Sequence, residues 1–144
     1  MTENLLLDDR TMLMFIEKER LKTFKGWPND SSWHCTPEKL AQAGFYFSPC
    51  SDCPDNVCCI FCLKELDGWE PDDDPVKEHT KHSPKCPFLT LKKPVENLTT
   101  TEFVKLAMEI LMIKIEKIFD KNIKEFEEQG KVNRSAITDH INGN

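Results

Sequence analysis

The chain has 144 residues and a mass of 16.7 kDa, which is the size of one ordinary domain and leaves no room for two separate cores. Its formal net charge is −6, which opposes a protein that wraps duplex nucleic acid, so we expect no direct nucleic-acid partner. The longest apolar run near the C-terminus covers only residues 110–113, and residues 8–10 are charged, so we expect an intracellular protein with no membrane span and no secretory signal.

The first two predicted elements are helices. Residues 10–24 carry apolar side chains at helical spacing and are followed by Gly26 and Pro28, which predicts one short amphipathic helix. Thr36 followed by proline is typical of a helix start, and Gly44 is the expected end of that second helix.

A small antiparallel sheet is predicted next, because three short segments rich in aromatic and β-branched residues are separated by turn-forming residues. These segments are residues 45–47, 57–61 and 66–69. Asp74 and Pro75 then repeat the helix-start pattern and predict a further helix.

The C-terminal region is predicted to be one long helix over residues 102–142, because no proline follows Pro94. It carries two apolar rows, and one small domain cannot cover both of them along their whole length. We therefore expect an intermolecular helix bundle or coiled coil, with a self-packed hairpin as the alternative. The first row is Phe103, Leu106, Ile110 and Ile113; the second is Met108, Met112, Ile115, Phe119, Ile123 and Phe126.

Cysteine and histidine spacing predicts a metal site. Seven cysteines in a reducing compartment favour metal ligation over a disulfide framework. Cys59 and Cys62 form a C-x2-C pair, which His79 and Cys86 follow. Three thiolates and one imidazole suit tetrahedral Zn²⁺, and four protein ligands leave no open position for hydrolytic chemistry.

Other ligand sets remain open from spacing alone. His82 lies one helical turn after His79 and could also face the metal, although spacing favours His79. Cys50 and Cys53 form a second C-x2-C pair that lacks suitably spaced partners. The remaining two cysteines, at 35 and 58, are interpreted as buried or incidental thiols.

These motifs together resemble the baculoviral inhibitor-of-apoptosis repeat over residues 15–91. The resemblance is carried by Arg20, Phe24, Gly26-Trp27-Pro28, Ala43-Gly44-Phe45, Cys59-x2-Cys62, Leu66-x-Gly68-Trp69-Glu70-x-Asp72-Asp73-Asp74-Pro75, His79-x2-His82 and Cys86. With one repeat, no RING domain and a long terminal helix, the chain is similar to the single-repeat members of the family. The resemblance assigns the fourth zinc position to His79 rather than to His82.

The fold that this resemblance implies is α+β. It is a small zinc-binding domain, with a short three-stranded antiparallel sheet and flanking helices, followed by one long helix. The implied organisation is an N-terminal segment (1–14), the repeat (15–91), a linker with a dimer contact (92–101) and the long helix (102–142).

The resemblance also implies a non-catalytic adaptor of the chromosomal passenger complex. Its long helix would pack with helices of borealin and the inner centromere protein and so recruit an aurora kinase. The expected partner-helix residues are Leu106, Ile110, Ile113, Ile115 and Phe119. The implied location is the nucleus and cytoplasm, at centromere and kinetochore and later at the spindle midzone and midbody. A direct or indirect restraint of caspases is the alternative function.

A peptide-binding surface is expected on the repeat, which would read a histone N-terminus that bears phosphothreonine. Nine acidic residues against two lysines lie between residues 52 and 78, and this charge favours a cationic partner such as a free α-amino group. Asp67 and Asp73 would take the amino group, Leu66 and Trp69 would line the pocket, and Lys64 and His82 would contact the phosphate. The alternative interpretation is a solvated acidic loop with Asp74 as a helix cap.

Further properties follow from the same resemblance. A homodimer contact is expected at Leu98 and Phe103, although Thr100 stands where the family usually has leucine. Asp67 replaces the usual glutamate, and Phe119 replaces a hydroxyl residue that a kinase modifies in relatives. Thr36 lies in a proline-directed phosphorylation motif and is equally suited to be a helix N-cap.

Overall fold

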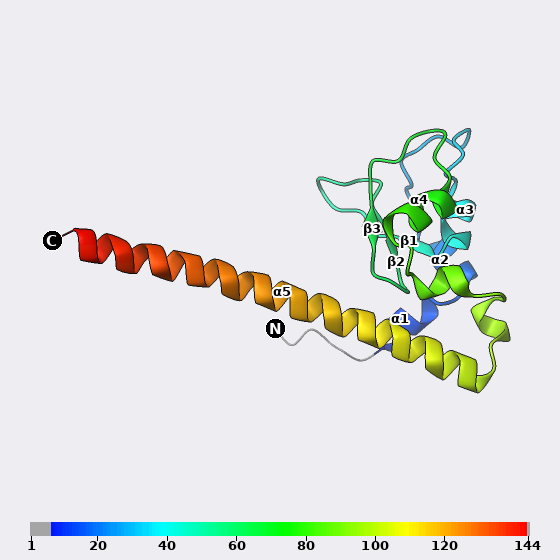
Figure 1. The fold of residues 1–144 in the computed structure, drawn as a ribbon. Coiled ribbons are helices and arrows are strands. Elements are labelled where there is room, and N and C mark those ends of the chain that lie inside the picture. Colours follow the sequence, from blue (N-terminus) through cyan, green and yellow to red (C-terminus); the bar gives the residue numbers. More distant parts are fainter. Residues whose placement is uncertain (1–6, 144) are drawn as a thin grey trace.

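A three-stranded antiparallel sheet forms the centre of the N-terminal part of the protein in this computed structural model, which describes residues 7–143 (Figure 1). Its order is β1 (Phe45–Phe47), β2 (Val57–Cys59) and β3 (Glu65–Leu66), with Phe45 opposite Cys59 and Val57 opposite Leu66. The predicted sheet is confirmed, and β2 and β3 are shorter than expected because the chain turns at Ile60 and the pairing of β3 with β2 ends at Leu66.

Two helices flank the sheet and begin where the capping residues predict. Helix α3 spans Pro37–Gln42, and the Thr36 side chain accepts a hydrogen bond from the backbone N–H of Lys39. Helix α4 spans Pro75–His82, and the Asp74 carboxylate accepts from the N–H groups of the first turn. Both helix starts are confirmed.

Gly44 ends the turn after α3 and allows a close approach between two segments. Its φ is +96°, in the region that favours glycine. A Cβ atom at this position would lie 2.9 Å from the ring of Phe88, so a side chain would displace that ring as well as strain the backbone. The absence of a side chain therefore lets the segment after α4 pack against the turn.

The single helix predicted over residues 10–24 is wrong, because the chain forms two short helices, α1 (Asp9–Leu13) and α2 (Glu17–Lys22). Arg20 gives the physical reason. Its buried guanidinium donates to the carbonyl oxygens of Met14 (3.0 Å) and Phe15 (2.8 Å), which a continuous helix would use for its own hydrogen bonds.

The C-terminal region forms one helix, α5 (Thr100–Asn142), which projects far beyond the domain (Figure 1). Two short 3-10 turns, Pro87–Thr90 and Val95–Asn97, lead into it. The helix begins two residues earlier than expected, because Thr99 and Glu102 form a reciprocal capping box. The ion pair with Lys93 and the Thr99 N–H lower the pKa of Glu102 to about 2. Within residues 7–143, none of the helices has both the length and the apolar character needed to cross a membrane.

The two apolar rows of α5 have different surroundings. Leu106 and Ile110 are buried in the core of the domain, whereas Phe119 remains 63% exposed. Ile110 and Phe119 are nine residues apart, which is about two and a half turns, so they point to opposite sides of the helix. The prediction that Leu106 and Ile110 bind a partner helix is therefore corrected: the domain itself covers them.

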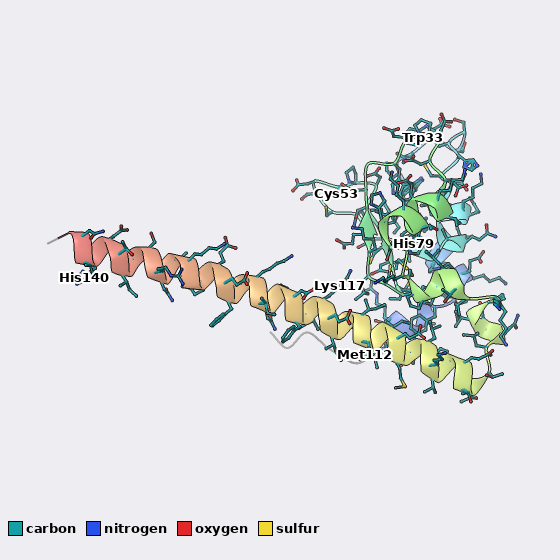
Figure 2. All side chains as sticks on the ribbon, viewed as in Figure 1. Trp33, Cys53, His79, Met112, Lys117 and His140 are labelled. Carbon is teal, nitrogen blue, oxygen red and sulfur yellow. The ribbon has the colours of Figure 1, made fainter. Side chains whose placement is uncertain are left out.

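A lysine holds the middle of α5 against the domain. Lys117 donates to the carbonyl oxygen of Leu63 at 2.6 Å, and Figure 2 shows it on the domain side of the helix while Met112 points away. Ile113 is half-buried, and Ile115 and Phe119 are exposed. The boundaries of the four predicted regions stay predictions, and residues 1–6 of the N-terminal segment lie outside the described residues.

Single replacements of Ile110 and of Phe119 by alanine should show which apolar row stabilises the domain. Ile110→Ala creates a cavity in the core and should lower the free energy of unfolding by about 2–5 kcal/mol. Phe119→Ala removes an exposed side chain and should change it by less than about 0.5 kcal/mol. Urea unfolding of the metal-loaded protein, followed by circular dichroism, measures both. Equal losses would contradict the assignment of Ile110 to the core and of Phe119 to the exposed side.

Candidate functional site

Four potential metal ligands meet inside the domain. Cys59 ends β2, Cys62 lies in the following turn, His79 lies on α4, and Cys86 precedes the first 3-10 turn. All four residues are buried, and their ligand atoms lie within 4.8 Å of one another. The cluster therefore joins the sheet, α4 and the segment that leads to α5.

The turn between the first two cysteines has the backbone geometry that aims both sulfurs at one point. Leu63 has a φ of +60°, and its N–H donates to the carbonyl of Cys59 at 2.8 Å. The Cys59 N–H donates in turn to the carbonyl of Lys64 at 2.9 Å. Because Lys117 of α5 donates to the Leu63 carbonyl, the long helix also supports this turn.

His79 is held in one orientation by its surroundings. Its Nδ1 lies 2.8 Å from the carbonyl oxygen of Ala43, so Nδ1 carries the hydrogen and Nε2 is left free as a ligand atom. The imidazole packs against the ring of Phe45, with the centroids 4.6 Å apart. A buried carbonyl and an aromatic ring thus set the tautomer and the direction of the ligand.

The separations between ligand atoms fit a tetrahedral zinc ion. Zn–S bonds of about 2.3 Å and Zn–N bonds of about 2.0–2.1 Å place two sulfurs about 3.8 Å apart and a sulfur and a nitrogen about 3.6 Å apart. The Cys59 and Cys86 sulfurs are 3.8 Å apart, and Cys62 Sγ is 3.5 Å from His79 Nε2. The donor set and its spacing therefore suit a closed structural metal site.

Burial makes a cation important for this cluster. Desolvation raises the pKa of the Cys59 thiol well above its ordinary value, whereas hydrogen bonds from Cys59 and Cys86 lower the pKa of Cys62. The buried thiols therefore do not all ionise unaided. A bound divalent cation stabilises the thiolates and releases their protons.

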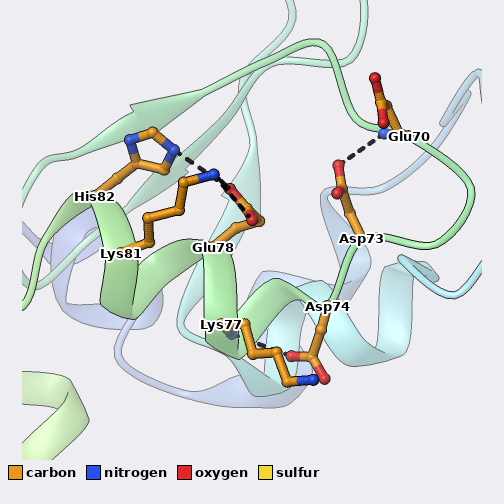
Figure 3. A network of polar contacts seen from close by, with 7 residues as sticks. All are labelled: Glu70, Asp73, Asp74, Lys77, Glu78, Lys81 and His82. Carbon is orange, nitrogen blue, oxygen red and sulfur yellow. Dashed lines mark hydrogen bonds and ion pairs between the residues drawn. The ribbon is translucent and has the colours of Figure 1, made fainter.

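The alternative ligands lie elsewhere. His82 is exposed at the end of α4, where its Nε2 lies 3.3 Å from Glu78 (Figure 3). Cys50 and Cys53 lie in the loop between β1 and β2, and Cys35 donates weakly to the carbonyl of Glu70. Among the described residues, these side chains do not belong to the four-ligand cluster.

The acid-rich region between residues 52 and 78, which we call the acidic surface, is held in shape by hydrogen bonds from backbone N–H groups to its carboxylates. The Asp73 carboxylate accepts from the Glu70 N–H at 2.8 Å (Figure 3), and Asp67 is exposed. Trp69 is buried edge-on against Phe45, with ring centroids 6.0 Å apart, so only part of the expected pocket wall is accessible. Leu66 and Lys64, which lie three and five residues before Trp69 in the sequence, are half-buried.

Asp55 and Arg20 have roles that motif spacing did not reveal. The Asp55 carboxylate accepts from the N–H groups of Gly68 (3.1 Å) and Trp69 (2.8 Å), so one loop acid positions the segment that carries the acidic surface. Arg20 also donates to the carbonyl of Ala41 and lies over the rings of Phe61 and Phe88. No local pattern marks either contact, because each joins residues more than ten positions apart.

The remaining predicted residues lie at the edges of the domain. Thr36 is the N-cap of α3 and is half-buried. Leu98 and Phe103 are half-buried against the core, and the Phe103 ring lies edge-on to Phe15 at 6.0 Å. Their expected roles in phosphorylation and dimer formation stay predictions.

Comparison with known proteins gives consistent matches. Residues 20–90 match the Inhibitor of Apoptosis domain, BIR. The chain is 48% identical over 124 residues to Baculoviral IAP repeat-containing protein 5 of Mus musculus, covering 86% of this chain and 89% of that protein. It is 50% identical over 118 residues to Baculoviral IAP repeat-containing protein 5.2 of Xenopus tropicalis, covering 82% and 76%. A crystal structure of DIAP1 BIR1 bound to a Grim peptide is 38% identical, with a TM-score of 0.46, and covers 62% of this chain and 79% of that one.

Replacement of one ligand should abolish metal binding, whereas replacement of the neighbouring histidine should not. Cys86→Ala leaves three ligands around a buried site, and we expect a protein that lacks metal and the cooperative unfolding of the parent. His82→Ala should retain one metal ion per chain. Elemental analysis of the purified proteins and their near-ultraviolet circular dichroism test this. A folded, fully loaded Cys86→Ala protein would contradict the ligand set.

Proposed function

The chain belongs to the inhibitor of apoptosis family, and from this we propose that it is a non-catalytic adaptor whose repeat, held by zinc, binds a peptide N-terminus while α5 binds partner helices. The proposal rests on the second apolar row of α5, which the domain does not cover and which we call the free row. In this helix of 43 residues, the domain buries Leu106 and Ile110 near the start, whereas the opposite apolar side remains exposed. Such a side needs a partner of matching apolar character.

The free row is continuous enough to bind another helix. Met108, Met112, Ile115, Phe119, Ile123 and Phe126 recur at helical spacing and are each more than 40% exposed. Their spacing of three and four residues is the pattern of a helix-bundle seam. We assign this row to helices of borealin and the inner centromere protein, through which an aurora kinase would be recruited.

The dimensions of the acidic surface support recognition of a short phosphorylated N-terminus. Asp73 precedes α4 and His82 ends it, so the two lie at opposite ends of a helix about 12 Å long. Three extended peptide residues span about 10 Å, and a phosphorylated side chain reaches further. An amino group at Asp67 and Asp73 and a phosphothreonine two residues later, near His82 and Lys64, therefore match this span.

The charges around His82 suggest how phosphate would be selected. Both His82 and Lys81 pair with the Glu78 carboxylate, at 3.3 and 3.2 Å (Figure 3). A phosphate that carries nearly two negative charges competes with a single carboxylate for these donors, and an unmodified threonine does not.

The other elements of the proposal concern assembly and location. Leu98 and Phe103 would contribute to a homodimer, and phosphorylation of Thr36 would add charge at the start of α3. The protein would act in the nucleus and cytoplasm, first at the centromere and kinetochore and later at the spindle midzone and midbody. Restraint of apoptosis would follow from binding caspases or their regulators.

Titration with a peptide that begins Ala-Arg-Thr, with and without phosphate on the threonine, tests the peptide surface. We expect tighter binding of the phosphorylated form, and His82→Ala should lower that affinity several-fold while leaving the unmodified peptide unaffected. His140→Ala is the matched control, because it removes an exposed imidazole at the far end of α5 (Figure 2). Calorimetry on zinc-loaded proteins measures each affinity. Equal affinity for both peptides would refute phosphate recognition.

A charge placed in the free row should prevent binding of partner helices. Phe119→Glu should abolish co-purification with the borealin and inner centromere protein helices, because a buried carboxylate without a partner opposes packing. Zinc content and the urea midpoint should stay unchanged, since Phe119 is exposed. Glu128→Lys, nine residues beyond Phe119 and on the opposite side of α5, is the control and should still bind. Retained binding by Phe119→Glu would show that another surface holds the partners.

A further inference from the structure

The C-x2-C pair between β1 and β2 has no role in the proposed function, yet its geometry is specific. Cys50 N–H donates to the Cys53 carbonyl at 3.1 Å, and Cys53 N–H donates to the Cys50 carbonyl at 3.3 Å. Figure 2 shows Cys53 on a loop that extends from the domain, well away from His79. The two cysteines therefore close a narrow loop that is separate from the metal cluster.

This backbone arrangement suits a disulfide bond. Two residues that exchange both backbone hydrogen bonds have Cα atoms about 5.5 Å apart. Disulfide-bonded cysteines have Cα atoms about 5.5–6 Å apart, so the bond needs little backbone movement. The thiols of Cys50 and Cys53 also interact with each other.

The two thiols differ in accessibility. Cys50 is exposed, whereas Cys53 is half-buried. Hydrogen bonding to Asp67 and to Cys50 raises the pKa of the Cys53 thiol to about 12, so this sulfur keeps its proton at neutral pH. An oxidant in solution therefore reaches the Cys50 sulfur first, and the neighbouring Cys53 is a protonated thiol.

We propose that Cys50 and Cys53 are a reversible redox site, which closes to a disulfide when the protein meets a hydroperoxide. The Cys50 sulfur attacks the terminal peroxide oxygen, an S–O bond forms, the O–O bond breaks, and an alcohol leaves. The Cys53 sulfur then attacks the Cys50 sulfur, the S–S bond forms, and the S–O bond breaks with loss of water. Two thiols lose two protons and two electrons, the hydroperoxide is reduced, and a thiol such as glutathione reverses the change.

The other cysteines are poorly placed for this reaction. Cys35 and Cys58 are buried, and the three cysteines of the metal cluster are buried too and would be held by zinc. Oxidation requires access to the sulfur, so the exposed Cys50 should react before the buried cysteines.

The disulfide would change the acidic surface, an effect that depends on the proposed peptide-binding function. Cys53 contacts Asp67, and Asp55 in the same loop holds the N–H groups of Gly68 and Trp69. Closing the bond removes the Cys53 hydrogen that Asp67 accepts and restricts the loop that carries Asp55. Peptide affinity should therefore differ between the reduced and oxidised proteins.

Mass spectrometry of the zinc-loaded full chain tests the site directly. The protein is treated with a small excess of hydrogen peroxide, remaining thiols are alkylated under denaturing conditions, and the chain is cleaved before aspartate. Cleavage before Asp52 separates Cys50 from Cys53, and cleavage before Asp55 separates Cys53 from the later cysteines. We expect a loss of two hydrogens, with peptides joined only through Cys50 and Cys53, full retention of zinc and reversal by glutathione.

Two serine variants make the outcome decisive. Cys53→Ser should show no bridge and should instead accumulate oxidised Cys50, whereas Cys58→Ser should form the same bridge as the parent. A bridge that includes a ligand of the metal cluster, or loss of zinc before the loop reacts, would overturn the proposal. So would an unbridged Cys50–Cys53 pair after oxidation. These readouts do not depend on peptide binding, so an unchanged peptide affinity in the bridged protein would count only against the coupling to the acidic surface.

Discussion

Convergence of Cys59, Cys62, His79 and Cys86 on one buried point constrains the remainder of the domain. The sheet is small, because each strand has only two or three residues, and the four side chains link it to α4 and to the segment leading to α5. A metal bound by all four side chains would supply on the order of 10 kcal/mol of folding free energy. With His79 directed inward, the row of α4 that carries Glu78 and His82 is left at the surface. The inward position of His79 and the exposed position of His82 are thus consequences of a single helix orientation.

Arg20 organises the other half of the core by a different principle. It is 2% exposed, and burial lowers the pKa of its guanidinium, yet its hydrogen-bond partners are carbonyl oxygens of Met14, Phe15 and Ala41. A planar cation with several donors can satisfy carbonyls from separate segments while two aromatic rings cover its faces. This arrangement interrupts the helix between α1 and α2, because the carbonyl oxygens of Met14 and Phe15 accept from Arg20 instead of from helical N–H groups.

Local chemistry explains which features were predictable from the sequence. Helix starts depend on groups within three residues, so Thr36, Asp74 and the prolines that follow them predict the starts of α3 and α4 correctly. The spacing of Cys59 and Cys62 is equally local, and these two residues do lie in the four-ligand cluster. The division of 10–24 into two helices depends on the inward position of Arg20. Its local partners are Met14 and Phe15, but Ala41 and the rings of Phe61 and Phe88, which enclose it, lie far along the chain. The same reason hides the role of Asp55. Periodicity revealed two apolar rows on α5, but which of them the domain covers depends on how the first 3-10 turn and Lys117 dock the helix.

The distal half of α5 extends beyond the domain and is not covered by the described residues of the domain. Every described residue from Asp120 onward is exposed, so the domain as described over residues 7–143 does not bury this half of the helix. Gly130 lies in its middle and costs about 1 kcal/mol relative to alanine, and most helical stability in proteins comes from tertiary packing of an apolar face. The partner helices proposed above would bury the exposed Ile123 and Phe126 and so stabilise the distal half of the helix. Because the acidic surface lies on α4 and the loop before it, occupation of α5 leaves that surface accessible, and the two proposed binding events can occur together on one chain.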